Sequence, residues 1–256
     1  MNEILNANEQ IRAYFRTLYA AWGHQHWWPA QSPFEVIVGA YLTQNTSWTN
    51  VERALESLRA ARVLSVAGIR RTPVKKLETL IRSSGYFRQK AQRLKTFVTF
   101  LDRTYGGSLS RMFAQPTAKL REELLALNGV GPETADSILL YAGNHPSFVV
   151  DAYTRRILER HQLLEANATY EEIRKQFEQA LKPLAEEILE CRPAANSGPP
   201  GSCHAPSRMS AAKREAAVQV FNEMHGLIVG VGKNYCKKSQ PDCERCPLSK
   251  FLDDRK

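Results

Sequence analysis

The stretch LALNGVGPETADSILLYAGNHPSFVVDAYTRR, residues 125–156, decides the fold of this chain. Its first part predicts two short helices joined by a turn at residues 128–131, Asn-Gly-Val-Gly. Glycine accepts the positive φ that such a turn requires, and it lets a ligand approach the backbone closely. Pro132 suits the first position of the second helix, where its missing N–H removes no hydrogen bond. The N–H groups of Gly129, Gly131 and the following helical turn are then available to an anion.

The second part of the stretch supplies a carboxylate. Asp151 follows three apolar residues and comes directly before a predicted helix, AYTRRILERH. An aspartate at this place suits the N-cap of that helix, and such caps are common. A catalytic carboxylate would have to lie near the hairpin, and the intervening helix allows that.

The composition is that of a basic globular protein. The chain has 256 residues, 43% hydrophobic and 24% charged, and its 35 Lys and Arg against 26 Asp and Glu give a net charge of +9. This length allows one large domain or two small ones, and the charge favours a polyanionic partner. No apolar run is long enough to span a membrane. The N-terminus predicts an amphipathic helix rather than a signal peptide, so we expect a cytoplasmic protein.

The rest of the chain shows helical periodicity and no sustained alternation of apolar and polar residues, so we expect an all-α fold. Pro73 and a capping Thr72 mark one helix start. Residues 191–210 are rich in Pro, Gly and Ser, which predicts an exposed flexible insertion. The other expected helices cover residues 3–21, 33–44, 48–62, 87–105, 116–126, 170–189 and 212–232.

The central stretch resembles the helix-hairpin-helix DNA glycosylase superfamily of endonuclease III. The shared pattern is L-x-G-V-G-x-x-T-A followed by V-D-x-x-x-R, with Asp151 eighteen residues after Glu133. The resemblance implies that Gly129, Gly131 and Thr134 grip DNA phosphates and that Asp151 serves base excision. It also implies a monomer that acts on double-stranded DNA with a damaged base.

The resemblance further implies two helical domains with the site in a cleft between them. One is a helical barrel over residues 26–142 that ends with the hairpin. The other joins residues 1–25 to residues 143–256 and carries a C-terminal cysteine cluster.

The pattern departs from the lyases of this superfamily at Glu133. Endonuclease III and its lyase relatives have a lysine there, which attacks the sugar to form a Schiff base. Glutamate cannot do so, and we therefore expect a monofunctional glycosylase. An acidic residue in a first helical turn is also favoured by the helix dipole, and both explanations can hold. Glu133 and Tyr153 are expected to line the base pocket.

Trp27, Trp28 and Trp48 predict an aromatic base pocket. Tryptophans are usually packed in cores, but here two adjacent ones precede a proline and the third lies at a polar junction. Aromatic faces attract a cationic base more than a neutral one. The chain also resembles the endonuclease III-like 3-methyladenine glycosylases, in which a Trp-Trp-Pro segment and a second aromatic sandwich the base. This favours alkylated purines as substrates.

Two alternatives to this substrate remain open. One is a glycosylase for mismatched or oxidised bases, with or without lyase activity. The other is a damage-sensing DNA-binding protein without catalysis, although mere binding has no use for the carboxylate of Asp151.

Four residues are expected to contact DNA around the lesion. Gln44 and Asn45 match the segment from which the family inserts a side chain into the gap left by a flipped base. Tyr86 occupies a second such position, and Lys90 follows it to bind phosphate. Each of them is also compatible with a helix cap or a surface loop.

The C-terminal cysteines Cys236, Cys243 and Cys246 match three ligands of the family's [4Fe–4S] cluster. Leu252 stands where the fourth cysteine would follow, and Cys203 is our candidate in its place. Cys191, a zinc site that includes His204, and a degenerate site without metal are the alternatives. We expect the cluster.

Overall fold

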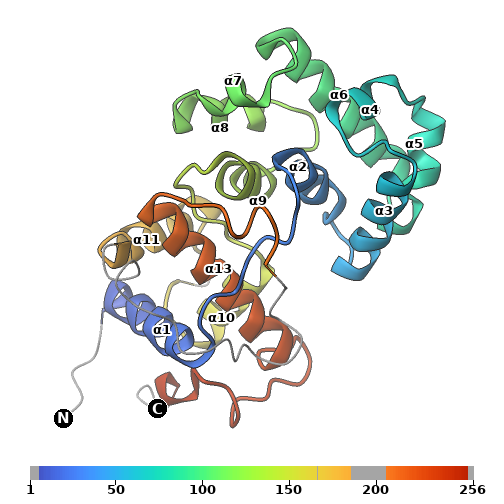
Figure 1. Cartoon of the computed structure of the whole chain (residues 1–256). Coiled ribbons are helices and arrows are strands. Elements are labelled where there is room, and N and C mark those ends of the chain that lie inside the picture. The colour runs from blue at the N-terminus through green and yellow to red at the C-terminus, as the bar shows by residue number, and fades with distance from the viewer. Residues whose placement is uncertain (1–5, 166, 186–205, 253–256) are drawn as a thin grey trace. The chain divides into compact units, whose positions relative to one another are not determined.

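The structure is a computed structural model, and it describes residues 6–165, 167–185 and 206–252. Over these residues the chain is helical and contains no strand, which confirms the all-α fold (Figure 1). It divides into two compact units. The end unit comprises residues 1–29 and 146–256, and the middle unit comprises residues 30–145. No helix in the described ranges is long and apolar enough to cross a membrane.

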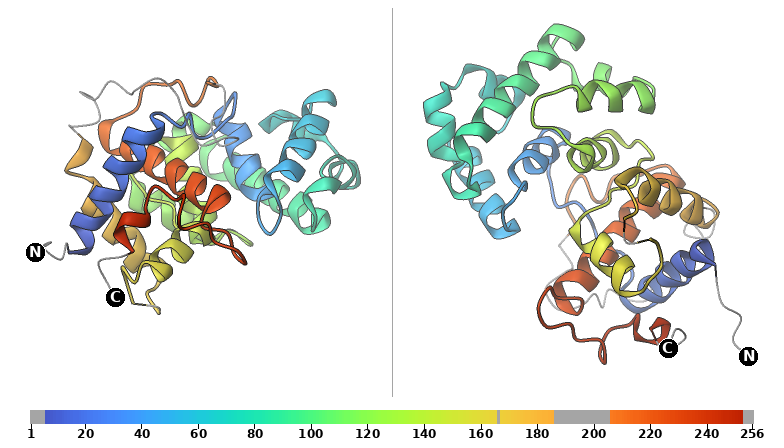
Figure 2. Two further views of the ribbon diagram at one scale, coloured as in Figure 1. Left: turned by 90° about the horizontal axis from the view of Figure 1, so that it is seen from below. Right: turned by 180° about the vertical axis from the view of Figure 1, so that it is seen from behind.

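The end unit is built around its last long helix, α13 (Ala216–Asn234). From Val220 to Gly232 every residue of α13 is buried. This helix contacts α1 (Ala7–Trp22), α10 (Ala152–Arg160) and α11 (Tyr170–Leu181), and α1 also packs against α11 (Figure 2). The two ends of the chain therefore share one core. A short 3₁₀ turn, η3 (Ser249–Phe251), follows the cysteines.

The middle unit places α2 (Pro33–Leu42) at its centre, with residues 34–42 all buried. It contacts α3 (Trp48–Ala60), α6 (Phe87–Tyr105), α9 (Pro132–Ser137) and the π-helix η2 (Ile138–Ala142). The remaining elements are α4 (Val66–Arg71), α5 (Val74–Leu80), η1 (Arg82–Ser84), α7 (Leu109–Phe113) and α8 (Thr117–Leu125). The pair α8 and α9 forms the predicted hairpin.

Three local expectations were wrong. Thr72 does not cap α5, because its Oγ1 donates to the carbonyl of Gly68 (2.8 Å) at the end of α4. α2 ends at Leu42, two residues before the expected end at Gln44, and the backbone of the following Asn45 is left-handed (φ 53°). Residues 191–205 lie outside the described residues, but residues 206–210 are not simply an exposed loop. Ser207 is buried and its Oγ donates to the carbonyl of Trp28 (3.4 Å).

Candidate active site and DNA-binding hairpin

Asp151 lies at the head of α10 as its N-cap, as the sequence predicts. Its Oδ1 accepts hydrogen bonds from the backbone N–H of Thr154 (2.8 Å) and from the Thr154 hydroxyl (2.9 Å). Its Oδ2 lies 3.6 Å from Nε2 of His225 on α13. The Asp151 side chain keeps 13% of its surface exposed. The carboxylate is thus fixed on one oxygen and still accessible.

His225 joins the carboxylate to the predicted aromatic pocket. Its buried ring lies 6.0 Å from the Trp27 ring and 6.4 Å from the Phe148 ring, measured between centroids. Burial lowers the pKa of His225, and the neighbouring Asp151 opposes that shift. The imidazole is therefore neutral at neutral pH.

The two predicted pocket tryptophans of the end unit, Trp27 and Trp28, are both buried and meet edge to face at 5.7 Å. The Lys233 ammonium lies 5.9 Å from the centroid of the Trp27 ring. A cation over an aromatic face is attracted to it. Trp27 therefore already has the kind of neighbour that a cationic base would supply.

A carboxylate on α13 anchors the segment that carries these tryptophans. Glu223 is 2% exposed, and it accepts from the backbone N–H of Gln25 (2.8 Å) and contacts Nδ1 of His24 (2.9 Å). The hydrogen bond that Glu223 accepts from His24 raises the pKa of His24, although partial burial opposes this shift. One turn later, a Cβ at Gly226 would lie only 3.2 Å from the Cβ of Trp27. The segment that carries Trp27 and Trp28 is thus held directly on α13.

Tyr153 lies beside Asp151 on α10 and is half-buried. Burial is the main cause that raises the pKa of its hydroxyl, and the Asp151 charge adds to it. Its ring packs against Gly232, where a Cβ would lie 2.2 Å from the ring, and the Arg156 guanidinium lies 5.0 Å from the ring centroid. These contacts make Tyr153 a packing residue between α10 and α13.

The hairpin turn has the geometry that its sequence predicts at one of its two glycines. Gly129 is left-handed (φ 78°), whereas Gly131 has an ordinary φ of −94° and precedes Pro132 at the first position of α9. The turn is closed by the Val130 N–H, which donates to the carbonyl of Leu127 (3.1 Å). A Cβ at Gly131 would meet nothing within 4 Å, so open space lies beside the backbone there.

Gln44 is clamped to this hairpin. Its amide nitrogen donates to the carbonyl of Gly129 (3.0 Å) and to the hydroxyl of Thr134 (2.9 Å), and its oxygen accepts from Arg93 (2.6 Å). Thr134, predicted to bind DNA, is itself buried. The side chains of Gln44 and Thr134 therefore hold the hairpin in this structure, whereas Asn45 is exposed.

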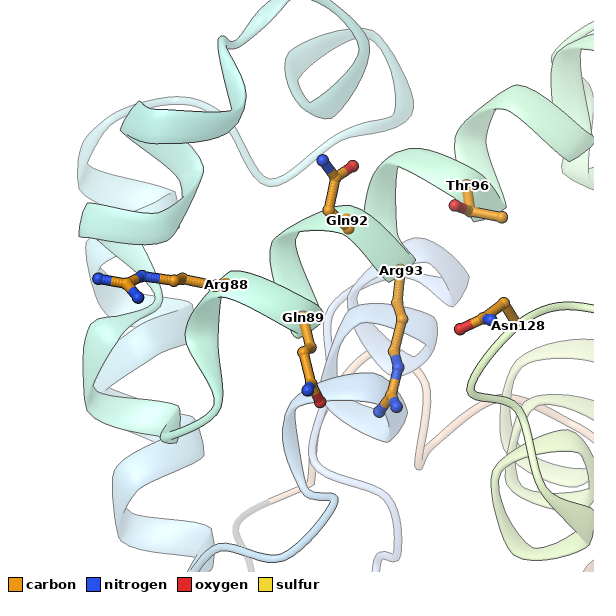
Figure 3. A pocket seen from close by; sticks show the side chains of 6 residues that line it. All are labelled: Arg88, Gln89, Gln92, Arg93, Thr96 and Asn128. Carbon is orange, nitrogen blue, oxygen red and sulfur yellow. The ribbon is translucent and has the colours of Figure 1, made fainter.

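Arg93 borders a polar groove of about 690 Å³ between α6 and the hairpin turn. Figure 3 shows Gln89 and Arg93 pointing the same way from α6, with Asn128 across from Arg93 on the turn. None of the predicted base-pocket residues lines this groove, which is bordered by Arg88, Gln89, Gln92, Arg93, Thr96 and Asn128.

Lys90 is 1% exposed and cannot reach a phosphate in this conformation. Its ammonium donates to the carbonyls of Leu42 (2.9 Å) and Ser84 (2.6 Å), and burial lowers its pKa to about 8. The expected phosphate contact is thus replaced by a structural one. Tyr86, two residues beyond Ser84, is 66% exposed and left-handed (φ 44°). Its exposed ring suits the predicted DNA contact.

The other two predicted pocket residues lie in the middle unit. Trp48 begins α3, and its indole N–H donates to Glu52 one turn later (2.9 Å). Glu133 is exposed in the first turn of α9. Neither the contact of Trp48 nor the position of Glu133 identifies a pocket by itself.

The cysteine cluster has three members in the described part of the chain. Cys236 and Cys246 are buried and Cys243 is exposed. Burial raises the pKa of Cys246 to about 11, and the charges of Cys236 and Cys243 add to that shift. An Arg160 N–H lies 3.2 Å from the Cys236 sulfur. Cys203, Cys191 and His204 lie outside the described residues. Within the described ranges no group of three or more His, Cys, Asp or Glu side chains is arranged to hold a metal.

Sequence reasoning did not find two residues of these sites, His225 and Arg93. His225 follows Phe221-Asn222-Glu223-Met224 in an apolar helix, where a histidine is usually a core residue. Arg93 is one of several basic residues in a long amphipathic helix. The available signal was weak: each lies on the helical face that faces its unit's predicted site.

The chain is similar to known DNA repair proteins. Residues 38–183 match the family model of the HhH-GPD superfamily base excision DNA repair protein. A Methanocaldococcus jannaschii protein provisionally named a DNA repair glycosylase is 38% identical, over 96% of this chain and 97% of its own. Endonuclease III of Thermotoga maritima is 28% identical, over 86% and 83% of the two chains.

Among solved structures, the H. pylori 3-methyladenine DNA glycosylase, bound to 1,N6-ethenoadenine, is similar with a TM-score of 0.69 and 27% identity. The match covers 90% of this chain and 98% of that one. The chain belongs to the HhH-GPD superfamily of base excision DNA repair proteins and is a DNA glycosylase of that family.

Proposed function

We propose that this glycosylase removes alkylated purines such as 3-methyladenine from double-stranded DNA and leaves the abasic strand uncut. The observation that carries the proposal is the carboxylate of Asp151, which is held on Oδ1 by Thr154 while Oδ2 lies 3.6 Å from His225. The same imidazole packs against Trp27. A fixed anion beside aromatic rings suits a sugar that becomes cationic as a base departs.

The reaction needs little from the protein beyond this carboxylate. When the bond between C1′ and the purine nitrogen breaks, its electron pair leaves with the base. An alkylated purine is cationic and therefore departs neutral, without a proton donor. The sugar keeps the positive charge, which Asp151 stabilises. Water then adds to C1′, and its proton passes to Asp151 and on to solvent.

Glu133 supports hydrolysis without a lyase step. It occupies the position of the lyase lysine, and a carboxylate cannot form a Schiff base. We therefore expect strand cleavage only after alkali and no protein–DNA adduct after borohydride treatment. An efficient borohydride adduct would show that another amine attacks the sugar.

The substrate class rests on the aromatic residues and on one structural relative. Trp27, Trp28 and Trp48 can provide faces that attract a cationic base. The similar H. pylori protein is a 3-methyladenine DNA glycosylase whose structure holds 1,N6-ethenoadenine. We carry the alkylpurine specificity to this chain on both grounds.

The partner we propose is damaged duplex DNA, bound by a monomer at the nucleoid. The net charge of +9 favours a polyanion. At the hairpin, the open space beside Gly131, just before α9 begins, leaves room for a phosphate. Asn45 and the exposed Tyr86 are the side chains we expect to enter the gap left by the flipped base.

A [4Fe–4S] cluster at Cys236, Cys243 and Cys246 is also part of the proposal, with Cys203 as the fourth ligand. The fit is incomplete in the described residues, since they supply three cysteines and no group arranged to hold a metal. Four thiolates are the usual requirement. The cluster would order the C-terminal segment, and no chemical step depends on it.

The deciding experiment is single-turnover excision from duplexes that each carry one defined lesion. The panel contains 3-methyladenine, hypoxanthine, a mismatched thymine and an oxidised purine, with Asp151→Asn as the control. Release of 3-methyladenine by the wild type and not by the variant supports the proposal. Release of only the mismatched or oxidised base would assign the substrate class of the alternative instead.

A further inference from the structure

The two oxygens of Asp151 have different neighbours. Thr154 supplies two donors to Oδ1, at 2.8 and 2.9 Å, as any good N-cap arrangement does. Oδ2 is 3.6 Å from Nε2 of His225, a residue that comes from another helix. Capping explains the first set of contacts and leaves the second unexplained.

His225 is placed where it can act on that oxygen. The residue is 4% exposed, and its ring is confined between those of Trp27 and Phe148. Next to it, Gly226 lets the backbone of the tryptophan segment lie against α13. The position of the imidazole is therefore fixed by packing.

The protonation state of His225 follows from its surroundings. Burial lowers its pKa, so the ring is neutral at neutral pH, with one N–H donor and one acceptor nitrogen. A carboxylate anion accepts hydrogen bonds and cannot donate them. The neighbouring Asp151 therefore favours the tautomer that carries its proton on Nε2.

The other charged groups near this pair have partners of their own. Arg156 on α10 donates to the carbonyls of Cys236 and Gly232, and Lys233 on α13 lies over Trp27. Glu223, half a turn before His225 on α13, contacts His24. Tyr153 is affected by the Asp151 charge and packs on Gly232. Asp151 is thus the charge that acts on the imidazole.

We propose that His225 is a positioning residue for Asp151, with the Nε2–H of the neutral ring directed at Oδ2. Together with Thr154 it fixes the rotation of the carboxylate and favours its anionic form. The contact shortens to a hydrogen bond when the substrate is bound, as contacts of catalytic groups often do. The inference rests on the proposed role of Asp151.

The test compares His225→Leu with His225→Gln. Glutamine places an amide N–H near the position of Nε2, whereas leucine fills the space without a donor. Single-turnover excision of 3-methyladenine is measured from pH 5 to 9, together with the Kd for the lesion duplex. A loss of carboxylate alignment costs about 10–100-fold in rate. We expect this loss in His225→Leu with an unchanged Kd, and an acid limb of the profile moved to higher pH. His225→Gln should keep most of the wild-type rate, and the acid limb of its pH profile should lie where that of the wild type lies.

An unchanged rate and pH profile in His225→Leu would overturn the inference. Equal losses of rate in His225→Leu and His225→Gln, with the acid limb of the pH profile unchanged, would also overturn it, because lost packing alone would explain them. If His225→Leu does not fold, the tautomer decides. Nitrogen-15 NMR of the wild type should show a protonated Nε2 whose resonance shifts in Asp151→Asn, and a protonated Nδ1 would contradict the proposal. A wild type that releases no base would instead refute the proposed function, while the NMR result would still test the contact.

Discussion

At the residue scale, Asp151 combines a cap with the proposed chemistry, and the two roles can be separated. Asn is as good an N-cap as Asp, so Asp151→Asn should keep the bond from Thr154 and the stability of α10. It removes the negative charge that stabilises the cationic sugar. We expect base release to fall by about 10²–10³-fold or more, with little change in DNA affinity. Excision rate and Kd are measured on one lesion duplex. Undiminished excision would remove Asp151 from the mechanism.

Trp48 provides a residue-scale test of substrate choice. A cation over an indole face gains about 0.5–2 kcal/mol that a neutral base of the same shape lacks. Trp48→Leu should therefore reduce excision of 3-methyladenine more than excision of neutral hypoxanthine, if the latter is processed. Trp27→Leu and Trp28→Leu should show the same bias where the ring faces the base. Equal losses of excision rate for both bases would mean that the rings only pack against the base and contribute no cation–π attraction.

Individual residues differ in how far sequence predicts them. The cap at Asp151 was predictable because its donors lie three residues away on the same helix. The partners of Lys90 were not, because they are carbonyls of Leu42 and Ser84, which only the folded middle unit brings to one ammonium. His225 was missed for the same reason.

At the element scale, the two hairpin glycines form a matched pair. Ala at Gly129 would be left-handed and would place its Cβ 2.0 Å from Nε of Arg93. We expect a stability loss of about 1–2 kcal/mol from the backbone alone. Gly131→Ala has an ordinary φ and no neighbour, so its Tm should equal that of the wild type. Its DNA affinity should fall, because the methyl group occupies the proposed phosphate site. If Gly131→Ala bound DNA with wild-type affinity, the phosphate would have to bind elsewhere.

The anchor between α13 and residues 24–25 predicts a pH dependence. The contact with Glu223 raises the pKa of His24 above its ordinary 6.5. A raised histidine pKa stabilises the fold fully below pH 6.5, and this contribution disappears as pH rises through the folded-state pKa. Glu223→Gln should therefore lose more stability at pH 5.5 than at pH 8.5, by about 1 kcal/mol.

Denaturant unfolding at the two pH values measures this difference. Other titrating groups, His225 included, are present in both proteins and cancel in the comparison. If Glu223→Gln lost the same stability at both pH values, only the hydrogen bond from the Gln25 N–H, and not the contact with His24, would contribute to the anchor.

Helices were more predictable than their ends. The apolar periodicity of residues 87–105 gave α6 with its observed bounds, because Gly85 and Gly106 break the pattern on both sides. The end of α2 was misplaced because Gln44 is held by Gly129 and Thr134, which are distant in sequence. Tertiary contacts of this kind leave no periodic signal.

At the scale of the whole molecule, the cysteines test the proposed cluster. Wild-type protein should carry about four iron atoms per chain and absorb broadly in the visible. Cys243→Ser and Cys203→Ser should each remove the iron, while Cys191→Ser, the matched control, should keep it. Iron analysis and absorbance of anaerobically purified protein measure this. Colourless, iron-free wild type would favour the degenerate site.

The order of the units along the chain has a consequence for synthesis. The middle unit is one continuous segment, so its sequence is complete once residue 145 has left the ribosome. The helix α1 is made before the middle unit, whereas its partners α11 and α13 are made after it. Domains fold as units during synthesis. We therefore expect nascent chains in which the middle unit is already folded and the apolar face of α1 is still uncovered. That face is covered only after α13 has been translated.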